Sequence, residues 1–137
     1  LAVATAIALS EGAGEGRDVG FCFDRKEAKE HGEGGMFVGT QPADGQAVVL
    51  VDDVVTSGIS IERAAALLRQ AADVRILGVV VAVDRQERGR ERSTLAELES
   101  ALGAPVLPVL NVRQIVERLR PEEKARIEEY LGLYGAS

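Results

Sequence analysis

The sequence has 137 residues, of which 46% are hydrophobic and 28% are charged, and these values suit about one globular domain. A net charge of −6 argues against a nonspecific nucleic-acid-binding protein, and no apolar stretch approaches the roughly 20 residues that cross a bilayer. We expect no nucleic-acid and no membrane partner. The single cysteine, Cys22, excludes a disulfide framework, so we expect a core thiol in a reducing, cytoplasmic compartment.

The first third of the chain predicts short elements around a charged loop. In chain order these are a helix at 1–9, a Gly-rich turn at 11–18, a buried strand at 19–23, a mobile loop at 24–35, a short strand at 36–39 and a turn at 41–46. The last strand and turn together suggest a hairpin. The helix begins at Leu1 without a loop, a capping residue or a Met, which indicates a truncated sequence.

The rest of the chain predicts alternating strands and helices. In order these are a strand at 47–51, a helix at 61–72, a strand at 76–83, a helix at 94–102, a strand at 105–110, a helix at 111–120 and a terminal helix from Pro121 to Tyr130. Thr94 with Glu97, and Asn111 with Gln114, have capping-box spacing. The all-apolar run 47–51 is typical of a parallel strand that helices cover on both faces. This pattern predicts a three-layer α/β/α fold with a mostly parallel sheet.

Ligands bind such sheets beyond the carboxyl ends of the strands, which directs attention to 52–60 and 84–88. Residues 48–60 combine a buried strand, two adjacent acids and a loop that enters a helix. The loop offers hydroxyl groups and free helix-start amides that can bind a phosphate, and Gly58 allows a close backbone approach. Asp52 and Asp53 would repel that phosphate unless they faced sugar hydroxyls or a cation, so the pattern favours a phosphorylated sugar as ligand.

Other interpretations of this segment are weaker. A Walker P-loop requires a lysine, which is missing from the sequence Ser57-Gly58-Ile59. A receiver domain normally opens with its acid-bearing strand, whereas here a strand, a charged loop and a hairpin come first. The remaining alternative is that this segment has no functional role and is only a capped helix beside two solvated acids.

The stretch Val-Leu-Val-Asp-Asp-Val-Val-Thr-Ser-Gly at 49–58 resembles the phosphoribosyl pyrophosphate (PRPP) motif of type I phosphoribosyltransferases. The stretch at 25–35, Arg-Lys-Glu-Ala-Lys-Glu-His-Gly-Glu-Gly-Gly, resembles the catalytic loop of the bacterial orotate enzymes of that family. Asp84 to Gly89 resembles their segment after the next strand. The resemblance extends over nearly the whole chain. It implies the type I phosphoribosyltransferase fold and transfer of ribose 5-phosphate from PRPP to orotate, giving orotidine 5′-monophosphate and pyrophosphate in pyrimidine synthesis.

The resemblance also implies roles for individual residues. The implied PRPP ligands are Arg25, Lys26, Lys29, His31, Asp52, Asp53, Val54, Val55, Thr56, Ser57, Gly58, Ile59 and Ser60. Catalytic roles fall on Lys29, His31, Asp52 and Asp53, and orotate contacts on Thr56 and Arg85. Considered alone, Arg85 would be a surface arginine paired with Glu87, and Arg88 would be solvated. Mg²⁺ is expected to bind mainly through the substrate, with Asp52 or Asp53 joining it through water.

Relative to that family, the sequence lacks the amino-terminal hood and the first core strand, so 1–137 is expected to be one partial phosphoribosyltransferase domain. The family also implies a homodimer in which 25–35 reaches the neighbouring subunit's site. We expect these 137 residues alone to be inactive and prone to associate. A transferase for another base, a regulatory protein on the same fold and an incomplete gene model remain alternatives.

Overall fold

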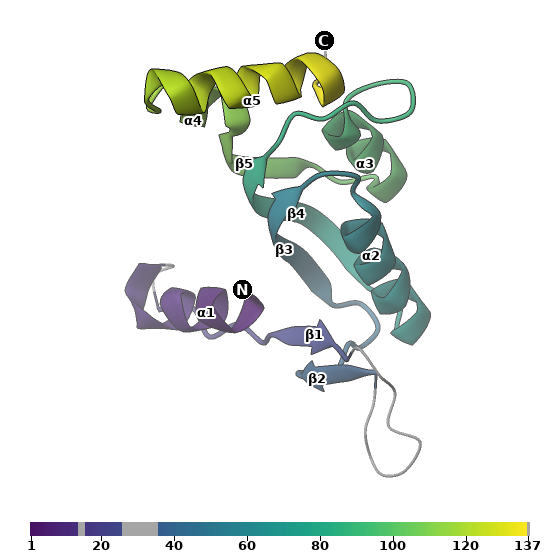
Figure 1. The fold of residues 1–137 in the computed structure, drawn as a ribbon. Helices are drawn as coiled ribbons and strands as arrows, with labels where there is room; N and C mark the ends of the chain where they lie inside the picture. The colour runs from purple at the N-terminus through teal and green to yellow at the C-terminus, as the bar shows by residue number, and fades with distance from the viewer. Residues whose placement is uncertain (14–15, 26–35, 137) are drawn as a thin grey trace.

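The computed structural model describes residues 1–13, 16–25 and 36–136 (Figure 1). Its elements are, in order, α1 (Ala2–Ala8), the π-helical turn η1 (Leu9–Ala13), β1 (Cys22–Asp24), β2 (Phe37–Gly39), β3 (Ala47–Val55), α2 (Ile59–Ala71), β4 (Arg75–Asp84), α3 (Thr94–Leu102), β5 (Val106–Asn111), α4 (Val112–Val116) and α5 (Pro121–Tyr134). The predicted α/β class with a parallel sheet is confirmed.

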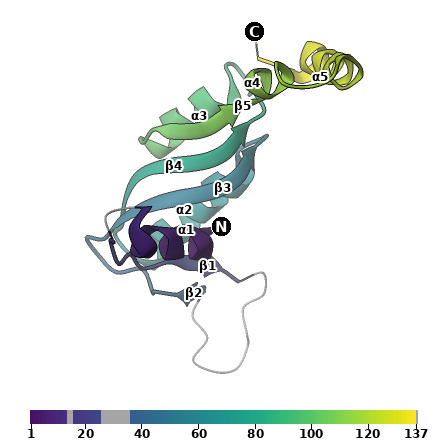
Figure 2. The ribbon, with the colours of Figure 1, turned by 90° about the vertical axis from the view of Figure 1, so that its left-hand side faces the viewer.

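Strands β3, β4 and β5 form a parallel sheet in that order. Helices α2 and α3 connect successive strands and lie on the same face of the sheet (Figures 1 and 2). The main core fills the space between this face and the two helices. Its buried residues are Val55, Ile61, Ala65, Val79, Val81, Leu98, Leu102, Ala104 and Val106. The β-branched strands and the apolar stripes of the helices therefore bury each other, as the periodicity predicts.

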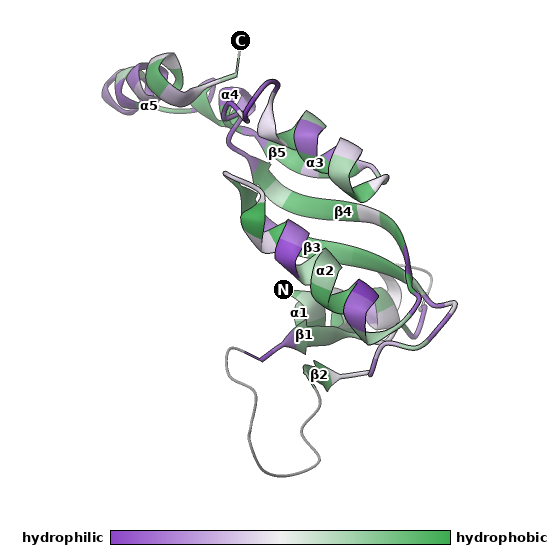
Figure 3. Ribbon diagram, turned by 90° about the vertical axis from the view of Figure 1, so that its right-hand side faces the viewer, coloured by the Kyte–Doolittle hydropathy of each residue, from purple (hydrophilic) through white to green (hydrophobic). Residues whose placement is uncertain are grey.

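The opposite face of the sheet carries exposed apolar side chains. Val49 and Leu77 are about half exposed, and Val109 is 67% exposed. Figure 3 shows strands β3 and β4 as largely hydrophobic and α5 as a mixture of hydrophilic and hydrophobic residues. The expectation that helices cover the 47–51 run on both faces is therefore wrong within the described residues. The apolar composition of the strand predicted helices on both faces of the sheet. The helices that follow β3 and β4 instead pack on the same face.

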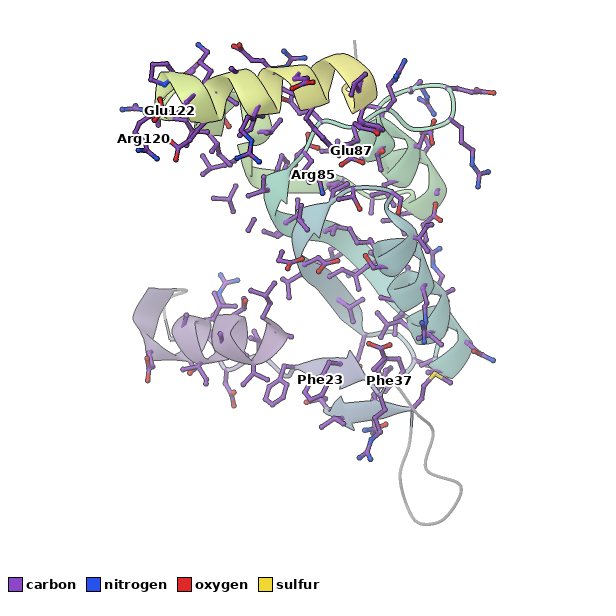
Figure 4. All side chains as sticks on the ribbon, in the orientation of Figure 1. Phe23, Phe37, Arg85, Glu87, Arg120 and Glu122 are labelled. Carbon is purple, nitrogen blue, oxygen red and sulfur yellow. The ribbon has the colours of Figure 1, made fainter. Side chains whose placement is uncertain are left out.

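The amino-terminal strands form a separate antiparallel hairpin in which β1 pairs with β2. The predicted buried strand at 19–23 is instead three residues long, and Phe23 is 46% exposed, because only 22–24 find partners in β2. Phe37 anchors the hairpin against Leu68 and Val74 (Figure 4). Cys22 packs partly buried on this cluster, and burial raises the pKa of its thiol.

Several predicted boundaries move. Helical structure continues into the predicted turn up to a kink at Gly12, whose φ is +114°. Strand β3 runs four residues beyond Val51 because Val54 and Val55 pair with β4. The helix predicted for 111–120 ends at Val116, and α5 extends beyond Tyr130 to Tyr134. Within the described ranges, no helix combines the length and the apolar character that crossing a membrane requires.

Capping explains which helix starts were predictable. Asn111 and Gln114 form the expected capping box at α4, with bonds of 3.0 and 2.9 Å. At α3 the bounds match the prediction, but the cap is Ser93, whose hydroxyl accepts from the Ala96 amide. The predicted cap, Thr94, is instead buried, and the Glu97 carboxylate bonds to the preceding loop.

Candidate functional site

The two segments singled out from the sequence meet at the carboxyl ends of β3 and β4. Val55 pairs with Asp84 in the parallel register, and the Arg85 amide donates to the Val55 carbonyl at 3.4 Å. The loop into α2 therefore begins beside the segment that carries Arg85. This adjacency is the arrangement that a parallel sheet imposes on consecutive strand ends.

Asp52 and Asp53 lie within β3, not beyond it. The Asp52 carboxylate is half-buried and accepts from the Asp53 amide at 2.9 Å and from the Ser60 hydroxyl at 3.1 Å. Asp53 is exposed, as expected because successive strand residues point to opposite faces. Asp52 thus links the strand to the first turn of α2, while the carboxylate of Asp53 is open to solvent.

Residues 56–58 connect β3 to α2 and leave the start of that helix open. Gly58 is the N-cap, and no side chain caps the helix. The amides of the first turn, at 59–61, point out of a helix of 13 residues, where the helix dipole favours an anion. Thr56 is half-buried, while Ser57 and Ser60 are exposed. The loop offers hydroxyl and amide donors without a lysine.

Gly58 is required by its conformation and by its packing. Its φ is +76°, and a Cβ at this position would lie 2.8 Å from the Leu98 side chain. The sequence suggested that Gly58 allows close approach of an anion. The structure adds a second reason, since the absent side chain makes room for a core residue of α3.

Arg85 lies in a cluster with two other side chains. Its Nε forms an ion pair with Glu87 Oε1 at 3.0 Å, and its Nη2 donates to the Tyr130 hydroxyl. The same hydroxyl donates to Glu87 Oε1 at 2.6 Å, and the guanidinium carbon lies 4.9 Å from the centre of the Tyr130 ring. Figure 4 shows Arg85 and Glu87 directly beneath α5. The pairing with Glu87, considered for an isolated arginine, is thus present.

Sequence reasoning missed Tyr130, which lies 45 residues from Arg85 and carries no local motif. It also left Arg88 as solvated, whereas its Nη2 donates to the Leu133 carbonyl at 2.6 Å. Both contacts come from α5, whose position no local pattern reveals.

The predicted basic loop is described only at its edge. The Arg25 amide donates to the Met36 carbonyl at 3.1 Å, and within the described residues the buried Arg25 Nε has no hydrogen-bond partner. Lys26, Lys29 and His31 lie outside the described residues. The structure therefore brings together 52–60 and Arg85, and leaves the contribution of the basic loop as a prediction.

Comparisons with known proteins agree with this arrangement. A protein of Bifidobacterium adolescentis named orotate phosphoribosyltransferase is 43% identical over 150 aligned positions, which cover 99% of this chain and 64% of that protein. A protein of the same name from Nitrosococcus oceani is 44% identical over 96% of this chain and 57% of its own length. The crystal structure of orotate phosphoribosyltransferase from Francisella tularensis superposes with a TM-score of 0.72 at 28% identity, covering 98% of this chain and 64% of that one.

The chain spans somewhat less than two thirds of the length of these relatives. The model of the phosphoribosyl transferase domain matches residues 1–99, which include β3, the loop at 56–58, α2 and Arg85. The chain therefore belongs to the phosphoribosyl transferase domain family.

Proposed function

We propose that this protein is an orotate phosphoribosyltransferase, which transfers ribose 5-phosphate from PRPP to orotate and releases pyrophosphate. The observation that carries this proposal is the meeting of an acid pair, an open helix start and an arginine at two adjacent strand ends. Identity of 43 and 44% to proteins named for this activity supports the choice of orotate.

The charges suit the chemistry. As pyrophosphate leaves C1 of the ribose, the sugar becomes cationic and the leaving group gains negative charge. Asp52 and Asp53 would bind ribose hydroxyls and stabilise the cationic sugar. The amides and hydroxyls of 56–60 would bind the 5-phosphate at the start of α2, with Val54 and Val55 as the strand end beneath it. Arg85 would bind orotate through a guanidinium–carboxylate contact, and Thr56 would add a hydroxyl contact.

Mg²⁺ fits this site as an ion that the substrate brings. The adjacent carboxylates of Asp52 and Asp53, within β3, offer fewer oxygens than the six ligands of an octahedral Mg²⁺. The ion would therefore take its other ligands from pyrophosphate, ribose and water. Its chemical contribution would be to neutralise the leaving group.

The basic loop completes the proposal. Arg25, Lys26, Lys29 and His31 supply positive charge for the leaving pyrophosphate, and His31 can donate a proton to it. We propose a homodimer in which 25–35 serves the neighbouring subunit's site. Light scattering that finds only monomers at assay concentration would refute this part.

The test is pyrophosphate release from PRPP and Mg²⁺ by the protein as its gene encodes it, with orotate, uracil, adenine and hypoxanthine compared. Orotate-dependent release is expected. Asp53→Asn and Asp52→Asn should each lower kcat/KM by about a hundredfold, the scale of a lost electrostatic contact in a transition state. The exposed Glu117→Gln on the remote end of α4 is the control and should keep full activity. Release with another base instead of orotate, or full activity in both aspartate variants, contradicts the proposal.

A further inference from the structure

The Arg85 side chain is held by a closed set of three contacts, one ion pair and two hydrogen bonds. Arg85 Nε forms the ion pair with Glu87, Arg85 Nη2 donates to the Tyr130 hydroxyl, and that hydroxyl donates in turn to Glu87. Every group uses its donor or acceptor capacity correctly, so the three contacts reinforce one another. The ring of Tyr130 lies against one face of the guanidinium. The protein therefore occupies one edge and one face of the Arg85 guanidinium group.

The other edge of the guanidinium remains available. Within the described residues, Nη1 of Arg85 makes no hydrogen bond or ion pair, and the side chain keeps 38% of its exposure. A planar guanidinium binds a carboxylate best when its orientation is fixed beforehand. We propose that Tyr130 and Glu87 are positioning residues, which orient Arg85 so that its free edge receives the carboxylate or neighbouring carbonyl of orotate. This inference rests on the proposed function.

The backbone beneath Arg85 is fixed by contacts that do not involve the Tyr130 hydroxyl. The Arg88 amide donates to the Tyr134 carbonyl at 2.8 Å, and the Ala136 amide donates to the Gln86 carbonyl at 2.7 Å. Gln86 has a φ of +54°, a conformation held by the bond from its amide to Asp84 Oδ1 at 2.8 Å. Removing only the hydroxyl of Tyr130 should therefore leave α5 docked and free the guanidinium.

Stability alone does not account for the cluster. An ion pair whose arginine is more than a third exposed contributes little to the folded state, because solvent screens it. The bond to Glu87 raises the pKa of the Tyr130 hydroxyl, so the hydroxyl stays protonated and keeps donating at neutral pH. The main consequence of these three contacts is that the Arg85 guanidinium has a fixed orientation.

The matched pair of variants is Tyr130→Phe and Tyr134→Phe. Tyr134 stacks on Tyr130 with ring centres 4.9 Å apart, and its hydroxyl makes no hydrogen bond within the described residues. In the protein as its gene encodes it, Tyr130→Phe should raise the KM for orotate about fivefold, the scale of one ordinary lost hydrogen bond. The KM for PRPP and the Tm of the Tyr130→Phe variant should equal those of the Tyr134→Phe variant. Equal orotate KM values in the two variants, or a fall in Tm with both KM values altered, would overturn the proposal.

Glu87→Gln gives an independent arm, with Glu129→Gln on the exposed side of α5 as its control. The Glu87 variant should weaken orotate use in the same way as Tyr130→Phe, and a normal orotate KM would count against the proposal. Should the wild type release no pyrophosphate with orotate, the proposed function fails by itself. NMR of the Arg85 Nη–H protons, one of which donates to Tyr130, then tests the orientation without substrate. Slow exchange with water that is lost in Tyr130→Phe supports it, and equal exchange overturns it.

Discussion

At the scale of single residues, two positions were chosen from local patterns but take their roles from distant neighbours. Thr94 had capping spacing, yet Ser93 caps α3, because Thr94 is buried in the helix and Ser93 is the last extended residue before it. Gly58 was interpreted as a phosphate-loop glycine, and Leu98 from another helix also leaves no room for a Cβ at this position. Side-chain chemistry was predictable at both places, and packing was not.

Gly58→Ala should therefore destabilise the protein through both strain and packing. A left-handed alanine costs about 1 kcal/mol, and its methyl group against Leu98 adds about 1–3 kcal/mol of overpacking. Gly103→Ala is the matched control, because Gly103 has a φ of +67° but nothing within 4 Å of the added Cβ, so only the conformational cost applies. Urea unfolding measures both free energies. If both variants lost the same free energy of unfolding, the contact with Leu98 would not contribute to the destabilisation.

At the scale of elements, the Glu97 carboxylate ties α3 to the loop before it. Glu97 accepts from the Glu91 amide at 2.7 Å and from the Arg92 amide at 3.0 Å. These backbone bonds hold the pKa of Glu97 at about 2, well below its usual 4.5. The carboxylate therefore binds the 91–92 turn to the first turn of the helix as long as it stays ionised.

This lowered pKa predicts an acid-dependent loss of stability. A carboxyl group whose pKa is lower in the folded chain stabilises the fold above its unfolded pKa and stops doing so as pH falls through the folded value. The free-energy difference between wild type and Glu97→Gln should be constant above pH 4.5 and shrink from there towards pH 2. Denaturant unfolding across this range measures it. Glu129→Gln should show no such dependence, and a flat difference for Glu97 would contradict the assignment.

At the scale of the whole molecule, the sheet has one buried and one exposed face. Val81 is completely buried under α2 and α3, whereas Val109 on β5 is 67% exposed. Threonine is nearly the same size and shape as valine, so exchanging them tests burial alone. Val81→Thr should cost about 1–3 kcal/mol, because the hydroxyl is buried, while Val109→Thr should cost less than about 0.5 kcal/mol. Thermal unfolding measures both costs. If Val109→Thr lowered the stability as much as Val81→Thr, the face of the sheet that carries Val109 would be covered in solution.

Much of the fold was predictable because the central elements have strong local signals. The strands at 47–51 and 76–83 were found because their β-branched runs are long enough to cross a buried sheet, and α3 was bounded correctly between Thr94 and Leu102. The strand at 19–23 was misplaced because its extent depends on three residues of β2. In the candidate site, the acid pair and the helix start were predictable, and the cluster around Arg85 was only partly so.

The sequence by itself determined the alternation of strands and helices and the acid pair beside an open helix start, since periodicity, capping and neighbouring residues are local properties of the chain. Only the tertiary structure decided which face of the sheet is covered, which residue requires Gly58, and that Tyr130 holds Arg85. These features depend on contacts between residues tens of positions apart. Such contacts leave no periodic trace in the sequence, because each partner is chosen by the packing of whole elements.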